Sequence, residues 1–264
     1  MWRALTLALV VVVGVSPALA AEKNLLVITE SKGFVHSVVK RPKAEELCLV
    51  EKTLILLGEK SGAFKATVTQ NSREAITAEN LKKYDAVFFY TTGELPLSDT
   101  QKADLLQFIR SGKGFAGSHC ATDTFYKWPE YGKLIGGYFD GHPWHEKIQV
   151  IVEDTKHPAT AHLGDKFQIT DEIYQFKGPY DRGDLHILMR MDAEFTKKPG
   201  KRQDKDYALA WTREYGKGRV FYTALGHRED VWADERFQKH MLGGLKYVMN
   251  LADGEATPSK KPGK

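Results

Sequence analysis

Gly114-Phe115-Ala116-Gly117-Ser118-His119-Cys120-Ala121-Thr122-Asp123 joins a short apolar strand directly to a polar turn. The preceding segment, from Ser98-Asp99 to Gly112, predicts a helix that begins at a serine cap and ends at a glycine. Before that helix, Tyr84 to Tyr90 contains a continuous apolar run, which is typical of a strand covered on both faces. The order strand, helix, strand indicates a β-α-β unit, in which the two strands are parallel.

The same alternation extends toward the N-terminus. Asn24 to Thr29 predicts a buried strand, and Pro42 to Gly58 predicts a helix with apolar residues at helical spacing. Phe64 to Thr69 alternates like a strand near the edge of a sheet. We therefore expect an α/β fold with a flavodoxin-like, doubly wound, mostly parallel sheet. Ligands should bind at the C-terminal ends of its strands.

The C-terminal half predicts added antiparallel strands. Lys147 to Val152 alternates like an antiparallel strand, and Tyr207 to Thr212 with Arg219 to Ala224 predicts a hairpin around Tyr215-Gly216-Lys217-Gly218. A final helix has apolar residues at helical spacing from Phe237 to Val248. Further short strands are expected at Phe167 to Thr170, Ile173 to Phe176 and Leu185 to Met191.

The two ends of the chain are expected to lie outside the domain. Residues 1–20 resemble a signal peptide, because Arg3 precedes an apolar run that is too short to span a bilayer, and Ala18-Leu19-Ala20 is a small-residue cleavage signal. We therefore expect an exported protein, periplasmic or extracellular, with no stable membrane span. Residues 21–252 form one domain, and residues 253–264 a disordered tail rich in lysine and proline.

The net charge and the cysteine content limit which partners and which cysteine-based sites we expect. The formal net charge of +4 falls to +3 when Arg3 is removed, and the basic residues are scattered, so a nucleic-acid partner is not expected. Cys48 and Cys120 are predicted to be two separate buried thiols, and no CxxC pattern indicates a zinc knot or a redox pair. The sequence leaves the oligomeric state open.

Four predicted strand-end loops carry polar groups, and His119 occupies the most informative place among them. A strand that turns sharply into a helix projects one side chain over the edge of the sheet, as in a nucleophile elbow. A histidine in that position can transfer protons near neutral pH or bind a metal. Cys120 is one place further along and is expected to point elsewhere, which disfavours a cysteine hydrolase. The other three loops contain His36, residues 136–145 and residues 226–230.

Several histidines are candidate metal ligands. His142 and His145 have the i, i+3 spacing of two ligands on one helical turn, although Pro143 argues against a regular helix there. Together with His119 and His227 they predict a site for a divalent metal such as zinc, and metal-assisted and acid–base chemistry both remain open.

Four further residues are candidates for contact with a substrate. Glu172 and Tyr174 alternate on one strand face, so both are expected to reach the site, the alternative being an edge strand with one solvated face. Asp123 either caps the following helix or acts on the substrate. The ring of Trp128 is a candidate for stacking on a sugar ring.

Five segments together resemble the ThuA-like (trehalose utilisation) family and cover about residues 24 to 250. They are the His36 loop, residues 114–123, Gly136-Gly137-Tyr138-Phe139 with His142-Pro143, Asp171-Glu172-Ile173-Tyr174, and Phe221-Tyr222-Thr223-Ala224-Leu225-Gly226-His227. The resemblance implies a class I glutamine amidotransferase-like, flavodoxin-type fold. It also implies a role in the use of trehalose and related glucosides through 3-keto-sugars, with a small sugar or glycoside as the partner.

The chain departs from the parent glutaminase pattern at one decisive position. That pattern has a cysteine at the elbow and a His-x-Glu pair near the C-terminus. Here His119 occupies the elbow, whereas His227 and Glu229 still match the His-x-Glu pair. The missing nucleophile argues against glutamine hydrolysis.

The leading hypothesis is an enzyme of isomerase, lyase or hydrolase type. In it His119 is the base or acid, His227 its partner and Glu172 an orienting group, while His36, Tyr174, Asp123 and Trp128 contact the substrate. The alternatives are a non-catalytic carbohydrate-binding protein and an interaction module.

Overall fold

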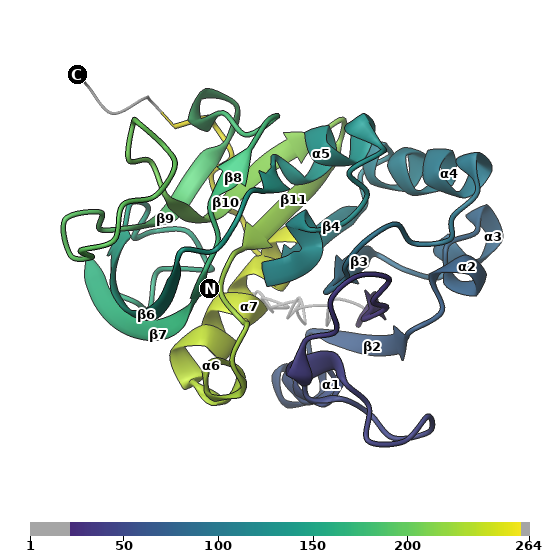
Figure 1. The fold of residues 1–264 in the computed structure, drawn as a ribbon. Coiled ribbons are helices and arrows are strands. Elements are labelled where there is room, and N and C mark those ends of the chain that lie inside the picture. The colour runs from purple at the N-terminus through teal and green to yellow at the C-terminus, as the bar shows by residue number, and fades with distance from the viewer. Residues whose placement is uncertain (1–21, 260–264) are drawn as a thin grey trace, which may run out of the picture.

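A nine-stranded sheet forms the centre of the computed structural model, which describes residues 22–259 (Figure 1). The strand order is β2-β1-β3-β4-β11-β10-β9-β6-β7. The predicted signal peptide, residues 1–20, lies outside the described residues.

The sheet has a parallel half and an antiparallel half. In the parallel half, neighbouring strands run in the same direction from β2 to β11. In the antiparallel half, each strand runs opposite to its neighbour from β11 to β7. The parallel half contains β1 (Lys23–Ile28), β2 (Phe64–Thr69), β3 (Ala86–Phe89), β4 (Gly114–Ser118) and β11 (Gly218–Thr223). The antiparallel half contains β6 (Trp144–Val152), β7 (Lys166–Ile173), β9 (His186–Met191) and β10 (Ala208–Tyr215). A separate antiparallel pair joins β5 (Tyr138–Phe139) and β8 (Phe176–Lys177).

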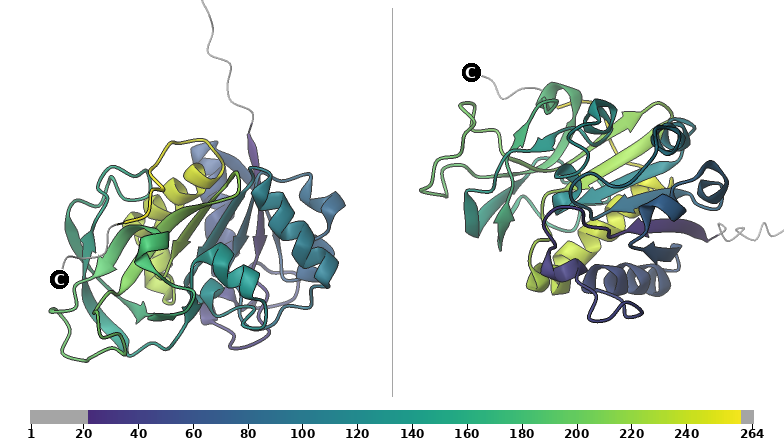
Figure 2. Two further views of the ribbon diagram at one scale, coloured as in Figure 1. Left: turned by 90° about the horizontal axis from the view of Figure 1, so that it is seen from above. Right: turned by 45° about the vertical axis from the view of Figure 1, so that its right-hand side comes forward.

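Helices cover both faces of the parallel half (Figures 1 and 2). On one face lie α1 (Leu49–Ser61), α6 (Glu229–Ala233) and α7 (Glu235–Val248). On the other lie α4 (Asp99–Arg110) and α5 (Pro129–Ile135). The remaining helices are α2 (Ser72–Ala75), α3 (Ala78–Leu81) and the 3-10 turns η1 (Ser37–Val39), η2 (His119–Thr122) and η3 (Arg182–Asp184). Strand β3 and residues 25–28 of β1 are fully buried between these layers, which explains their continuous apolar sequence. The doubly wound, mostly parallel fold with added antiparallel strands is therefore confirmed.

The first long helix begins later than the sequence predicts. The expected start is Pro42, but α1 begins at Leu49 with Cys48 as its N-cap. Glu51 explains the difference, because its carboxylate accepts a hydrogen bond from the Cys48 backbone N–H at 3.0 Å and closes the first turn there. The Arg41 guanidinium also binds this carboxylate, which holds the preceding segment out of the helix. Cys48 and Cys120 are both buried free thiols, as expected.

The antiparallel half curls back toward the parallel half (Figure 1). Three strands separate β7 from β11 in the sheet, yet the Gly226 N–H after β11 donates a hydrogen bond to Asp171 in β7 at 2.7 Å. The strongly bent β6 and β7 produce this approach. The curl brings the end of β7 beneath the C-terminal edge of the parallel strands.

Residues 253–259 lie against the sheet, although the sequence places them in the disordered tail. The Ser259 N–H donates to the Leu185 carbonyl, and the Ile187 N–H donates to the Ser259 hydroxyl, both at 2.8 Å. Thr212 donates to the Glu255 carbonyl at 3.0 Å. Residues 260–264 lie outside the described part, so the prediction for them stays a prediction. Among residues 22–259, no helix combines the length and apolar character that crossing a membrane requires.

Candidate functional site

His119 occupies the sharp turn between β4 and η2. Its φ of +46° lies in the left-handed region, which a residue with a side chain adopts at a cost. The turn is held because Tyr222 donates its hydroxyl to the His119 carbonyl at 2.6 Å. The ring is fully buried, and its Nδ1 lies 2.8 Å from the Ala224 carbonyl. Because that carbonyl only accepts, Nδ1 carries a proton, and Nε2 is the ring nitrogen that faces the site.

The loop after β1 holds His36. Thr92, which follows β3, fastens this loop by donating its hydroxyl to the Phe34 carbonyl and accepting a hydrogen bond from the Gly33 N–H. The contact requires a glycine at position 93, where a Cβ would lie 2.8 Å from the Gly33 nitrogen. The His36 ring is buried against His119, with ring centroids 5.0 Å apart.

The loop after β11 holds His227, and Asp171 positions this loop. One carboxylate oxygen of Asp171 accepts from the Gly226 N–H at 2.7 Å, and the other accepts from the Arg228 N–H at 3.2 Å. Tyr90 and Trp232 donate to the Gly226 carbonyl. Both sides of residue 227 are thus fixed to buried groups.

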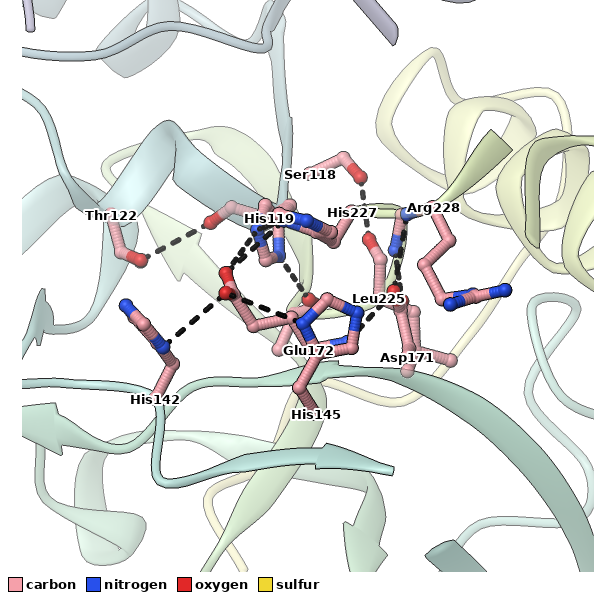
Figure 3. A network of polar contacts seen from close by, with 12 residues as sticks. Ser118, His119, Thr122, His142, His145, Asp171, Glu172, Leu225, His227 and Arg228 are labelled. Carbon is pink, nitrogen blue, oxygen red and sulfur yellow. Dashed lines mark hydrogen bonds and ion pairs between the residues drawn. The ribbon is translucent and has the colours of Figure 1, made fainter. Parts of the chain in front are cut away.

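Glu172, from the antiparallel half, lies against the imidazoles of His119 and His227 (Figure 3). Its Oε2 lies 3.1 Å from His227 Nδ1 and 3.4 Å from His119 Nε2. The two histidine nitrogens are themselves 3.2 Å apart. One ligand atom from each of His36, His119, Glu172 and His227 lies within 4.8 Å of all the others, and we call these four residues the inner cluster.

Burial and charge set the protonation of the inner cluster. Burial lowers the pKa of His36 to about 3, helped by the positive charge of His119 and His227, so this ring is neutral. Burial opposes the charge of Glu172, but hydrogen bonds from His119 and His227 outweigh it and lower the pKa of the carboxyl. Burial likewise opposes protonation of His227, yet the hydrogen bond and charge of Glu172 raise its pKa overall. The anionic Glu172 carboxylate therefore lies close to both His36, whose pKa is lowered, and His227, whose pKa is raised.

His142 and His145 lie on the solvent side of Glu172, and we call them the outer pair (Figure 3). Their side chains are 51% and 48% exposed, and their Nδ1 atoms lie 3.3 and 4.0 Å from Glu172 Oε1. His142 lies in a loop and His145 in β6, so the pair does not form the helical turn that its spacing allows. The site is therefore open to solvent on the side of the outer pair.

The structure brings most of the other predicted site residues to the cluster. The Tyr174 ring lies 4.1 Å from the His119 ring, just beyond the end of β7. Asp123 ends η2 and accepts a hydrogen bond from the Tyr126 hydroxyl at 2.6 Å, so it does not cap a following helix. Trp128 is not brought there: its ring is buried and packs against Phe125 and Tyr131.

Sequence reasoning missed the roles of Asp171 and Phe34. Asp171 is fully buried and alternates with Glu172, so strand periodicity places it on the face away from the site. The segment Asp171-Glu172-Ile173-Tyr174, which carries part of the family resemblance, is the signal that was available in the sequence. Phe34 is 65% exposed, with its ring centroid 4.8 Å from that of His36.

The cluster is suited to proton transfer, to anchoring an oxygen-rich ligand and to binding a cation. It is not suited to thiol catalysis, because Cys120 is fully buried and this burial raises its pKa well above the ordinary value. A thiolate nucleophile is therefore absent at the elbow.

Comparison with known proteins gives a consistent result. The family model described as ThuA, trehalose utilisation, matches residues 24–248. A putative ThuA-like protein from Bacteroides uniformis is similar in structure, with a TM-score of 0.70 and 20% identity over 89% of this chain and 95% of that one. One from Parabacteroides merdae has a TM-score of 0.67 and 20% identity over 86% and 90%.

A cytoplasmic protein from Salmonella typhimurium has a TM-score of 0.55 and 11% identity over 86% of this chain and 98% of that one. At these identities the structural neighbours establish the fold alone. A search of the curated proteins finds no match to the sequence.

Proposed function

The chain belongs to the ThuA family of trehalose utilisation, and we propose that it is an exported enzyme acting on a glucoside or its 3-keto derivative. The observation that carries the proposal is the meeting of three imidazoles from the parallel half with Glu172 from the antiparallel half. A fold needs no such convergence of costly polar groups for its stability. Membership of a family described as trehalose utilisation supports a sugar substrate.

The reaction that fits these groups is proton transfer beside a carbonyl. A ketone at C3 of a glucoside acidifies the hydrogen on C2. When a base removes this proton, the C–H electrons pass to the carbonyl oxygen and form an enolate. Reprotonation at another atom gives isomerisation. Alternatively, the enolate collapses, the bond from C1 to the aglycone oxygen breaks, and an acid protonates that oxygen.

The outer pair is placed to exchange these protons. His142 and His145 are half exposed on the access side, and imidazoles both accept and donate protons near neutral pH. The sequence assigns the base role to His119, but this ring is fully buried behind Glu172 and binds the Ala224 carbonyl. We therefore assign His119 to the inner cluster, where it positions Glu172 and His227.

The inner cluster is placed to stabilise the enolate oxygen. The His227 imidazolium is held in its charged form by Glu172 and is partly exposed. A fixed positive charge beside a developing oxyanion lowers the barrier because it needs no reorganisation during the reaction. His227 and the outer pair thus serve different atoms of one substrate.

Assay of a 3-keto-glucoside tests the proposal. We expect His145→Ala to lower kcat/KM about 10²–10⁴-fold, the usual contribution of a positioned acid–base group. His119→Ala, which removes a positioning residue, should lower it about 10–100-fold. His162→Ala, an exposed histidine on the β6–β7 connection, is the matched control and should retain full activity. Circular dichroism of each variant checks the fold. Full activity of the His119 variant would contradict the assignment, and calorimetric sugar binding without turnover would favour a carbohydrate-binding protein.

Export is the second part of the proposal. It is supported by the charged, apolar and small-residue segments of residues 1–20. Expression of the full chain in a bacterium, followed by mass spectrometry of the periplasmic fraction, should give a protein that begins at Ala21. Recovery of only the uncleaved chain in the cytoplasm would overturn it.

A further inference from the structure

We propose that the inner cluster binds one divalent transition-metal ion, with His36, His119, His227 and Glu172 as its ligands. The inference concerns the cluster itself and does not depend on the identity of the substrate. It also replaces the ligand set that the sequence predicts, in which His142 and His145 accompany His119 and His227.

The separations within the cluster match those of metal ligands. A tetrahedral ion with bonds of about 2.0–2.1 Å places its ligand atoms about 3.3 Å apart. His119 Nε2, His227 Nδ1 and Glu172 Oε2 are separated by 3.2, 3.4 and 3.1 Å. Three donor atoms from different parts of the chain thus already form one face of a coordination shell.

The orientation of the ligand atoms shows why a cation fits there. Because His119 Nδ1 donates to the Ala224 carbonyl, Nε2 is the ring atom that faces the cluster. Glu172 Oε2 and His227 Nδ1 lie 3.4 and 3.2 Å from it. Carboxylate oxygens and imidazole nitrogens are both ligands of zinc and related ions, so an ion between these three atoms would bind all of them.

His36 completes the shell. Its ring forms a triangle with those of His119 and His227, with centroid distances of 5.0 and 5.2 Å from them and 5.1 Å between them. The buried Nδ1 of this ring has no hydrogen-bond partner. A buried polar atom without a partner is costly, and a neutral imidazole is a good ligand for zinc and related ions.

The surroundings resemble the second shell of a metal site. A metal-bound histidine usually donates its other N–H to a carbonyl or carboxylate, as His119 does to Ala224. Asp171 fixes the loop on both sides of His227 and also accepts from the Glu172 N–H at 3.0 Å. Two of the four ligands are therefore held in place by one buried carboxylate.

Each carboxylate oxygen of Glu172 faces a different group of histidines, one the inner cluster and the other the outer pair. Oε2 faces His119 and His227, whereas Oε1 faces His142 and His145. An ion on Oε2 leaves the half-exposed outer pair free for substrate. In the metal-bound protein the ion takes the place of the His227 proton as the positive charge of the site.

Direct metal binding tests the inference. The purified chain is stripped with a chelator, dialysed, and titrated with ZnCl₂ or MnCl₂ alone, with elemental analysis and calorimetry as readouts. We expect one equivalent of metal per chain and a higher melting temperature when it is bound. Glu172→Gln and His36→Gln should each weaken binding by more than the roughly 10–100-fold loss that follows removal of a second-shell partner.

Two controls separate the cluster from its surroundings. His145→Ala and His162→Ala should leave the metal affinity unchanged, because the first belongs to the outer pair and the second is an exposed histidine elsewhere. Substoichiometric binding, or binding that survives Glu172→Gln and His36→Gln, overturns the inference. Turnover of a keto-glucoside by a chain that binds no metal in the titration overturns the inference while leaving the proposed function intact. Metal binding without turnover upholds the inference and contradicts that function.

Discussion

The parallel and antiparallel halves of the sheet hold their site residues in different ways. In the parallel half, His36, His119 and His227 follow the ends of β1, β4 and β11 and lie in loops or short turns. In the antiparallel half, Glu172 lies inside β7 and pairs with His145 of β6 in the hydrogen-bonded ladder. The position of a loop residue can change without disrupting the sheet, whereas the position of a residue inside a strand is fixed by the hydrogen bonds of the sheet. The carboxylate of the site is therefore coupled to the fold more tightly than the imidazoles are.

The largest expected effect lies wholly within the antiparallel half. Arg182 is buried and donates to Asp206 at 2.8 Å and to Glu153 at 2.6 Å. Arg182→Met leaves the buried Asp206 carboxylate with the Tyr180 hydroxyl but without its paired cation, and we expect it to lower the free energy of unfolding by about 3–5 kcal/mol. Denaturant unfolding measures this loss, and the activity per folded molecule should not change. Lys205→Met, which breaks an exposed pair with Glu194, is the control and should have no measurable effect. A similarly small loss for the Arg182 variant would contradict the prediction.

The contact between the two halves should respond to pH. His240 of α7 is buried against the Ala159 carbonyl in the β6–β7 connection, and burial lowers its pKa to about 3. The unfolded chain takes up this proton near pH 6.5, so it binds more protons than the folded chain below that value. Stability is thus lost as the pH falls from about 6.5 toward 3, by up to about 1.4 kcal/mol per pH unit for one such group.

Replacement of that imidazole isolates its contribution. His240→Gln should flatten the dependence of the unfolding free energy on pH in this window, measured by urea denaturation from pH 7 to 4. An unchanged slope would show that His240 takes up its proton in the folded state.

A smaller effect is expected where the fold and the site share one residue. Asp171→Asn keeps the size of the side chain but places N–H groups against backbone donors, so we expect a loss of about 1–3 kcal/mol in stability. Because the His227 loop loses its anchor, kcat should also fall about 10–100-fold, with little change in KM. Ser118→Ala, which removes one hydrogen bond to the Leu225 carbonyl in the parallel half, should cost about 0.5–1.5 kcal/mol. Loss of stability at Asp171 without loss of kcat would separate the anchor from the chemistry.

The smallest effect on stability is expected at the rim of the parallel half. Phe34 is 65% exposed, so Phe34→Ala should change the unfolding free energy by less than about 0.5 kcal/mol. Its ring borders His36, and we expect KM for a sugar to rise because an apolar face beside the site is removed. Leu56→Ala on the exposed face of α1 is the control and should leave KM unchanged. Equal KM values for both variants would remove Phe34 from the site.

The same contrast explains what the sequence could predict. In the parallel half, apolar runs, caps and glycines identify the strands, and topology alone places residues such as His119 and His227 at one edge. The start of α1 escaped prediction because Glu51 closes the first turn through a contact with Cys48, which outweighs the signal of Pro42.

In the antiparallel half, alternation identifies the strands but not the curl that brings β7 under β11. This curl results from tertiary packing, so no local pattern shows that Glu172 meets His119. For the same reason, the sequence assigns Asp171 to the face of the strand opposite to Glu172. The burial of Trp128 results from packing against Phe125 and Tyr131, and its sequence position alone is equally compatible with stacking on a sugar.

The left-handed turn at His119 has an evolutionary consequence. Asparagine and glycine tolerate a φ of +46° better than histidine does, so the imidazole at this position comes with conformational strain in the backbone. A library screened for heat resistance alone should therefore enrich His119→Asn or His119→Gly, and on the proposed function its most stable members would lack activity. A histidine at this turn is placed against the conformational preference of the backbone, which is the pattern expected of a residue that serves a site and not the fold.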